Sequence, residues 1–189
     1  MKTAIILHGM PSKDEYFNPD SEAQSNKHWL PWIQRKLILN GILAQAIELP
    51  EPYEPVYDNW SQVFNQFKVD KDTILIGHSC GAGFLVRWLS ENKINVGKVA
   101  LVAPFLDPNK NEVASDFFNF DIDPHFTERT AGTAIFYSSD DDEEILTSVS
   151  QIKEKLLNVK TMEFKDKGHF IYESMKGAEF PELAEWLLA

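Results

Sequence analysis

The sequence predicts an α/β fold in which an open, mostly parallel six-stranded sheet carries helices on both faces. Three observations favour it: six short runs rich in β-branched or apolar residues, helical patterns between them, and a length of 189 residues, which suits one domain over 1–189. Parallel strands need crossover connections, and the crossing helices cover the sheet. A closed eight-stranded barrel is disfavoured because it typically takes about 250 residues.

The predicted strands are runs of four to six residues, too short for helices with a clear period. They are Thr3–Leu7, Leu43–Glu48, Thr73–Ile76, Lys98–Val102, Thr133–Tyr137 and Val159–Phe164.

The predicted helices repeat apolar residues at the helical period. Pro31 lies near the start of the first and Asn40-Gly41 ends it, while Pro181 opens the last. The helical patterns cover Trp29–Leu37, Val56–Phe67, a run that starts at Ala82, Ile145–Leu157 and Pro181–Leu188.

Composition excludes several classes of protein. The hydrophobic share of 43% and the charged share of 25% are typical of globular domains. A net charge of −11 disfavours nucleic acid and anionic membrane surfaces as partners. The sequence has no apolar run near the eighteen or so residues of a membrane span. Cys80 is the single cysteine, so no intrachain disulfide can form, and we expect a cytoplasmic protein.

The most informative motif is Gly77-His78-Ser79-Cys80-Gly81, between the third predicted strand and the next helix. A G-x-S-x-G sequence in this setting is typical of a nucleophile elbow, in which the serine lies on a sharp turn and the glycines leave room for neighbouring backbone. The alternatives are a glycine-rich turn with Ser79 as a helix cap, and Cys80 as the nucleophile. We favour Ser79.

A serine nucleophile needs a base, which a third group orients. His169 follows the sixth predicted strand, and the order Ser, acid, His is that of α/β-hydrolases. We predict that His169 is the base. The other histidines, His8, His28, His78 and His125, are better explained as turn or core residues.

The acid should follow the fifth strand, where Asp140, Asp141, Asp142, Glu143 and Glu144 form an unbroken acidic run. Such a run also stabilises the N-terminus of a following helix. A calcium site is disfavoured because the run lacks the spacing and glycine of a calcium loop. One carboxylate is therefore expected to orient His169, and its neighbours to interact with the helix.

The oxyanion of an acyl-transfer reaction requires backbone donors after the first strand and directly after the nucleophile. Met10 and Cys80 are the candidates. We expect neither a metal nor a cofactor. Two connections, Pro11–Lys27 and Ala103–Gly132, are long enough to form part of a site. The second is rich in phenylalanine, which is compatible with an acyl pocket and equally with a helix packed on the core.

These segments resemble the small single-domain α/β-hydrolases of the YdeN and retinoblastoma-binding protein nine type. The similar segments are Ile5–Gly9, His28–Trp32, Gly77–Ser79, Ser138–Leu146 and Gly168–Phe170. The resemblance implies a minimal hydrolase without a large cap. It also implies that the acid heads an Asp-x-x-aliphatic pattern, which Asp142 with Ile145 fits best; Asp141 is the alternative.

The sequence therefore predicts a serine hydrolase that cleaves small carboxylic esters, or amides, through an acyl-enzyme on Ser79, His169 and Asp142. Without a large cap, the pocket should suit short or medium acyl groups. The competing hypothesis is a binding protein, with a protein partner, that keeps the hydrolase scaffold and has little turnover.

Overall fold

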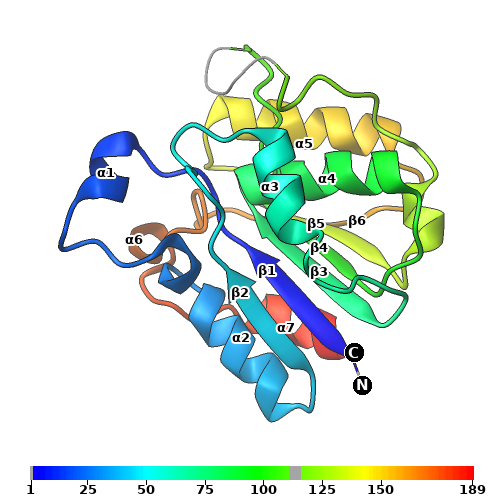
Figure 1. Cartoon of the computed structure of the whole chain (residues 1–189), viewed down its shortest axis with the longest axis horizontal. Coiled ribbons are helices and arrows are strands. Elements are labelled where there is room, and N and C mark those ends of the chain that lie inside the picture. The colour runs from blue at the N-terminus through cyan, green and yellow to red at the C-terminus, as the bar shows by residue number, and fades with distance from the viewer. Residues whose placement is uncertain (1, 111–115) are drawn as a thin grey trace.

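Six parallel strands form one sheet in the order β2-β1-β3-β4-β5-β6 (Figure 1). The structure, a computed structural model, describes residues 2–110 and 116–189. The strands are β1 (Thr3–Leu7), β2 (Leu43–Ile47), β3 (Thr73–His78), β4 (Val99–Val102), β5 (Thr133–Ser138) and β6 (Lys160–Phe164). Every ladder between neighbouring strands is parallel, which confirms the predicted open sheet.

Helices cover both faces of the sheet, as predicted: α2 and α7 lie on one face, and α3, α4 and α5 on the other (Figure 1). The α-helices are α1 (Lys13–Phe17), α2 (Leu30–Leu39), α3 (Tyr57–Phe64), α4 (Cys80–Asn92), α5 (Glu143–Lys155), α6 (Tyr172–Met175) and α7 (Pro181–Leu188), and the 3₁₀ turns are η1 (Gln24–Asn26) and η2 (Phe126–Arg129). The short helices α1 and α6 bury no residue, so the apolar period had nothing to detect in them.

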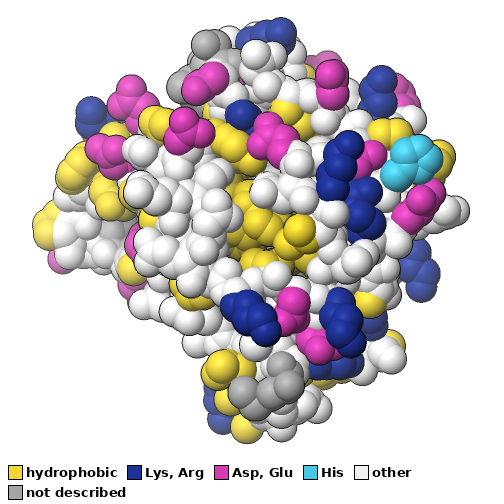
Figure 2. Space-filling view, turned by 45° about the vertical axis from the view of Figure 1, so that its right-hand side comes forward, with side chains coloured by type: hydrophobic (Ala, Val, Ile, Leu, Met, Phe, Trp, Pro, Cys, Tyr) yellow, Lys and Arg dark blue, Asp and Glu magenta, His cyan; other side chains and the backbone are white. Residues whose placement is uncertain are grey.

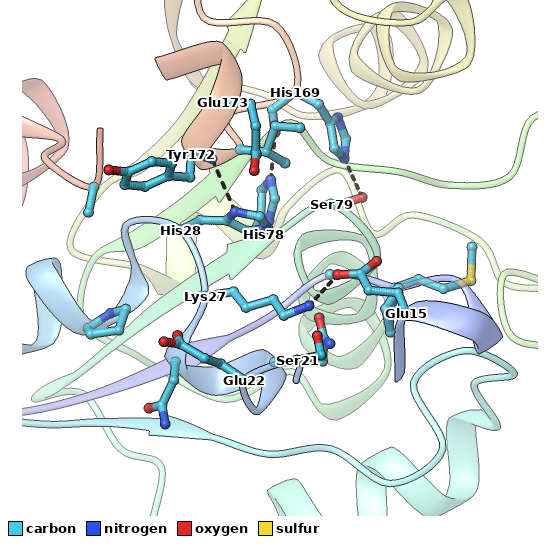
Figure 3. A pocket seen from close by; sticks show the side chains of 18 of the residues that line it. Glu15, Ser21, Glu22, Lys27, His28, His78, Ser79, His169, Tyr172 and Glu173 are labelled. Atoms are coloured by element: carbon cyan, nitrogen blue, oxygen red, sulfur yellow. Dashed lines mark hydrogen bonds and ion pairs between the residues drawn. The ribbon is translucent and has the colours of Figure 1, made fainter. Parts of the chain in front are cut away.

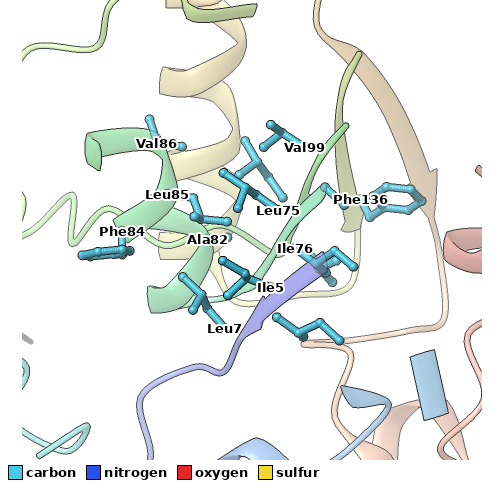
Figure 4. Close-up of a cluster of buried hydrophobic side chains, with 14 of the residues drawn as sticks. Ile5, Leu7, Leu75, Ile76, Ala82, Phe84, Leu85, Val86, Val99 and Phe136 are labelled. Carbon is cyan, nitrogen blue, oxygen red and sulfur yellow. The ribbon is translucent and has the colours of Figure 1, made fainter. Parts of the chain in front are cut away.

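The core lies between the sheet and its two helical layers (Figure 4). All six residues of β3 are buried, as expected for a central parallel strand covered on both sides. On one face Leu85 of α4 is fully buried, and on the other Phe136 of β5 packs edge-on against Trp186 of α7 with ring centroids 5.8 Å apart. The strand that leads to Ser79 is therefore held rigidly from both faces.

The described residues of the phenylalanine-rich segment 103–132 contribute both to the core and to an opening beside Ser79. Phe117 is fully buried and packs edge-on against Trp60, with centroids 5.2 Å apart, so it belongs to the core. Phe105 lines an opening beside Ser79. Within 103–110 and 116–132 the helical structure is limited to η2, and residues 111–115 lie outside the described part.

Charged side chains of both signs are interspersed over the face shown in Figure 2, and hydrophobic side chains gather near its centre. Over the described ranges, we find no helix whose length and apolar character would let it cross a membrane.

Candidate active site

Ser79 lies on the sharp turn between β3 and α4, with φ 52° and ψ −119°. This is an unfavourable conformation for a residue with a side chain, and it persists only where the surroundings fix it. The Ser79 N–H donates to the Val102 carbonyl at 2.9 Å, and the Ser79 carbonyl accepts from the Phe105 N–H at 3.1 Å. The turn after β4 thus clamps the strained residue from both sides.

The two glycines of the motif are required by close backbone contacts. A Cβ at Gly81 would lie 2.3 Å from the carbonyl oxygen of His8, and one at Gly77 would lie 2.6 Å from the Cα of Ala82. Neither contact is with a flexible side-chain end, so the backbone itself would have to move. The spacing of the motif therefore reflects how closely α4 approaches β1 and the elbow.

Three side chains form a continuous hydrogen-bonded line at the carboxyl ends of the strands. His169 Nε2 lies 2.9 Å from Ser79 Oγ, and its Nδ1 lies 3.1 Å from both carboxylate oxygens of Asp141. The Asp141 side chain is 1% exposed and that of His169 is 28% exposed. The ring of His169 is thus reachable from solvent, whereas the carboxylate of Asp141 is shielded.

The carboxylate within hydrogen-bond distance of His169 is that of Asp141 and not that of Asp142, the predicted acid. Asp142 is the N-cap of α5 and is exposed, and its backbone N–H donates to Oδ1 of Asp141 at 2.8 Å. The chain leaves β5 at Ser138 and turns into α5 within four residues, and this turn directs the preceding carboxylate inward. The Asp-x-x-aliphatic pattern predicts an acid in this turn but does not determine which of its carboxylates faces His169.

Asp140 has a different part in the same turn. Its Oδ1 accepts from the hydroxyl of Ser138 and from the Gly168 N–H at 3.0 Å, while the Lys167 N–H donates to Ser138 Oγ at 3.1 Å. The hydrogen bond from Ser138 lowers the pKa of Asp140, because it favours the charged form. Asp140 thus ties the strand-β5 turn to the loop that carries His169.

The remaining histidines differ in burial: His8 and His78 are buried, His28 is half-buried and His125 is exposed. His8 accepts from the Leu49 N–H at its Nε2, so its other nitrogen carries the proton and donates to the Gly9 carbonyl. Burial lowers the pKa of His8, and burial together with three neighbouring histidines lowers the pKa of His78 well below its ordinary value. His125 is exposed and contacts Glu128. The interpretation of His8 as a satisfied core residue is confirmed.

The two predicted oxyanion donors are Met10 and Cys80. Met10 lines both openings at the serine, and Cys80 is the first residue of α4. Backbone N–H groups in the first turn of a helix have no partner within the helix, and the helix dipole adds positive potential there. The Cys80 side chain is fully buried, and burial raises the pKa of its thiol, which argues against a thiolate nucleophile.

Two openings meet at Ser79. The larger is a cleft of about 750 Å³ between the Pro11–Lys27 connection and the segment after β6 (Figure 3). The smaller, of about 180 Å³, is lined by Phe105 and Ile145 as well as Ser79 and His169. A substrate can therefore extend from the serine in two directions.

Acidic side chains dominate the larger cleft. Glu15, Asp20, Glu22 and Glu173 line it, whereas Lys27 is the single Lys or Arg among its described lining residues and forms an ion pair with Glu15 (Figure 3). Across residues 2–110 and 116–189, no three His, Cys, Asp or Glu side chains are grouped so that they could hold a metal ion.

A nucleophile elbow on an open parallel sheet, with a histidine and a carboxylate behind the serine, defines an α/β-hydrolase-fold protein. The sequence profile of the serine hydrolase family matches residues 18–187, so the chain belongs to the serine hydrolase family. The resemblance found in the sequence is thereby confirmed.

Relatives in sequence and structure agree with this assignment. The chain is 24% identical to YdeN of Bacillus subtilis (strain 168) over 175 residues, covering 90% of this chain and 86% of YdeN. It is 26% identical to the serine hydrolase RBBP9 of Rattus norvegicus over 159 residues, 82% of each chain. The crystal structure of the B. subtilis ydeN product superimposes with a TM-score of 0.82 at 22% identity, covering 99% of this chain and 97% of that one.

Proposed function

We propose that the protein hydrolyses small carboxylic esters, or amides, through an acyl-enzyme formed on Ser79. The observation that carries the proposal is the hydrogen-bonded line from Asp141 through His169 to Ser79. A serine hydroxyl is weakly nucleophilic unless a base removes its proton, and a base works best when a third group fixes its orientation. In this proposal Ser79 is the nucleophile, His169 is the base, and Asp141 is the group that orients the base.

In the acylation step, His169 Nε2 takes the proton of Ser79 Oγ while the oxygen attacks the substrate carbonyl carbon. Asp141 accepts the Nδ1–H of His169, which holds the neutral ring in the tautomer whose Nε2 is a free base. The same carboxylate stabilises the imidazolium that forms. Collapse of the tetrahedral intermediate breaks the bond to the leaving group, which receives the proton from His169.

The negative charge that develops on the carbonyl oxygen needs donors already in place. We assign this role to the backbone N–H groups of Met10 and Cys80. Cys80 begins a helix of 13 residues whose N-terminus points at Ser79, so the helix dipole favours the anion at the same spot.

In the deacylation step, His169 removes a proton from water, and the resulting hydroxide attacks the acyl carbon. The carboxylic acid leaves, and the proton returns to Ser79 Oγ. The exposure of His169 gives water access to the ring. A short acyl group suits the smaller opening because its volume is about 180 Å³ and Phe105 and Ile145 form an apolar part of its lining, which also includes Asp142 and Glu144.

A fluorophosphonate probe tests the nucleophile, since it forms a covalent bond with an activated serine. We expect the protein to be labelled and Ser79→Ala to remain unlabelled. Ser139→Ala is the matched control, because this exposed serine lies close to the same turn but bonds the Phe164 carbonyl. Labelling that survives Ser79→Ala would overturn the assignment.

Nitrophenyl esters of increasing acyl length test turnover and the acyl preference. We expect short esters to be cleaved faster than long-chain ones. A protein that hydrolyses none of them faster than free imidazole does would instead support the binding-protein hypothesis.

A further inference from the structure

His169 lies on a loop in which an adjacent residue has an unfavourable backbone conformation. Both of its neighbours have left-handed backbone conformations, Gly168 with φ 47° and Phe170 with φ 54°. Phenylalanine is rarely found there, and such a conformation persists only where the surroundings over-determine it. Phe170 is fully buried and stacks on Phe180 with centroids 5.3 Å apart, which fixes the loop on its inner side.

His78 holds the backbone of His169 itself. Its Nε2 lies 2.8 Å from the His169 carbonyl oxygen, and because a carbonyl can only accept, His78 donates (Figure 3). The two rings lie 5.1 Å apart. His78 is 3% exposed and comes from β3, a strand in which every residue is buried. The base is therefore tied through its main chain to the strand that presents the nucleophile.

His28 holds the far end of the same loop. Its Nδ1 lies 3.1 Å from the backbone nitrogen of Tyr172, so the ring accepts a hydrogen bond from the peptide N–H (Figure 3). His28 itself has φ 56°, a second unfavourable conformation on the other side of this contact. Its ring lies edge-on to His78, with centroids 5.8 Å apart.

The His28 segment is firmly anchored to the core. Trp29 is fully buried and packs edge-on against Phe180, with centroids 5.6 Å apart. The carboxylate of Glu48, just after β2, accepts from the backbone N–H groups of Gln24 and Ser25 at 3.1 and 2.8 Å. Because the segment around His28 is anchored independently, the hydrogen bond between His28 and Tyr172 constrains the backbone of Tyr172.

We propose that His28 and His78 are positioning residues that together brace the His169 loop and set the distance between its ring and Ser79. The inference rests on the proposed function. Both histidines line the larger cleft, but in this role they act through the backbone of the loop and not on the reacting atoms. It accounts for a histidine at the start of the His28–Trp32 segment, which the proposed acyl transfer does not use.

The chemical step should be sensitive to this brace. A displacement of about 1 Å at a reacting group can lower a rate on the order of 10²-fold. Asp141 and Ser79 constrain the ring, but the loop backbone needs its own partners because Phe170 is held in an unfavourable conformation. Losing one brace should therefore lower the rate of bond formation more than the binding of a small substrate.

His28→Gly and His28→Asn make a matched pair. Both lose the ring and both tolerate a left-handed conformation, but asparagine keeps an acceptor oxygen near the position of Nδ1. We expect His28→Gly to lower the saturating rate of fluorophosphonate labelling between about 10- and 100-fold, with the half-saturating concentration changed little. His28→Asn should recover most of the rate. Ala23→Gly, at the exposed start of η1, controls for added chain flexibility.

His78→Gln and His78→Leu repeat the comparison at the second brace. Glutamine can place a donor near the position of Nε2, whereas leucine fills the site without one. We expect the leucine variant to be labelled more slowly than the glutamine variant. Urea unfolding of each variant identifies conditions in which it is fully folded, and all rates are compared there.

The inference is overturned if folded His28→Gly is labelled as fast as the wild type, or if His28→Asn is as slow as His28→Gly. A purely structural role would lower the free energy of unfolding and leave these rates unchanged. Failure of the proposed function has a different signature, because the wild-type protein would then not be labelled at Ser79 at all.

Discussion

The backbone N–H of Asp142 donates to Oδ1 of Asp141 at 2.8 Å, and the same oxygen lies 3.1 Å from Nδ1 of His169. Asp142 thus supports the line of hydrogen bonds through its main chain, while its carboxylate is exposed at the start of α5. The two aspartates have adjacent positions but separable contributions, and substitution of each side chain should distinguish them.

Asp141→Asn should lower kcat for a nitrophenyl ester on the order of 10⁴-fold, because an amide no longer fixes the productive tautomer or stabilises the imidazolium. Asp142→Asn should change kcat little and lower the free energy of unfolding by about 0.3–1 kcal/mol, the usual contribution of a carboxylate at a helix N-terminus. Steady-state kinetics and urea unfolding measure the two effects. If Asp142→Asn were the inactive variant instead, the assignment of the orienting carboxylate to Asp141 would be overturned.

The free energy of unfolding should fall on mild acidification, because His78 is buried as the neutral imidazole. Burial lowers its pKa, with His169 and His28 adding to the effect, so below a pH of about 6.5 the unfolded chain binds a proton that the folded protein does not. This stability is present above pH 6.5 and is lost as the pH falls towards the lowered pKa. The slope is at most about 1.4 kcal/mol per pH unit for one histidine.

His78→Gln removes this titration while it can keep a donor near the same position, so urea unfolding between pH 7.5 and 5.5 should show a shallower slope. His125→Gln is the matched control at an exposed histidine and should leave the slope of the wild type. Equal slopes in all three proteins would exclude His78 as a source of the acid sensitivity.

Gly81→Ala should destabilise the protein even though alanine favours helices. The position is helical, where alanine is better than glycine by about 1 kcal/mol. The new Cβ would lie 2.3 Å from the His8 carbonyl oxygen, and overpacking of this kind typically costs about 1–3 kcal/mol, with larger values when backbone must shift. We expect the cost of this contact to exceed the gain in helix propensity. A variant with a higher midpoint in urea than the wild type would contradict this prediction.

Substrate charge should matter at the larger cleft. Among the described residues, four carboxylates and one lysine line this cleft, and the lysine is already paired with Glu15. Of two esters with the same acyl group, one with a cationic leaving group should have a higher kcat/KM than one with an anionic leaving group, and added salt should reduce the difference. Glu173→Gln should reduce it too. No dependence on charge or salt would show that the leaving group does not enter this cleft.

Much of the fold could be predicted because its signals are local. Buried parallel strands appear as short apolar runs, and the glycines of the elbow mark positions where a Cβ would meet backbone. Ser79 and His169 could be predicted to lie together because Ser79 directly follows β3 and His169 lies in the loop after β6, and the carboxyl ends of parallel strands meet at one edge of the sheet.

The sequence could not predict which carboxylate faces His169, and the reason is physical. Which of Asp140, Asp141 and Asp142 points inward depends on backbone angles within a single turn, and a rotation of one residue exchanges them. The contact between His28 and Tyr172 joins residues 144 positions apart through a backbone N–H, so no pattern of side chains announces it. Contacts of this kind become visible only in three dimensions.

The buried thiol of Cys80 makes the elbow observable without any label on the substrate. It is the single cysteine, it is fully shielded, and it follows Ser79 directly. A maleimide should therefore react only when the junction of β3 and α4 opens, and its rate of attachment reports the frequency of that local opening. Comparing this rate with global unfolding would show whether the strained turn opens by itself or only when the whole sheet comes apart.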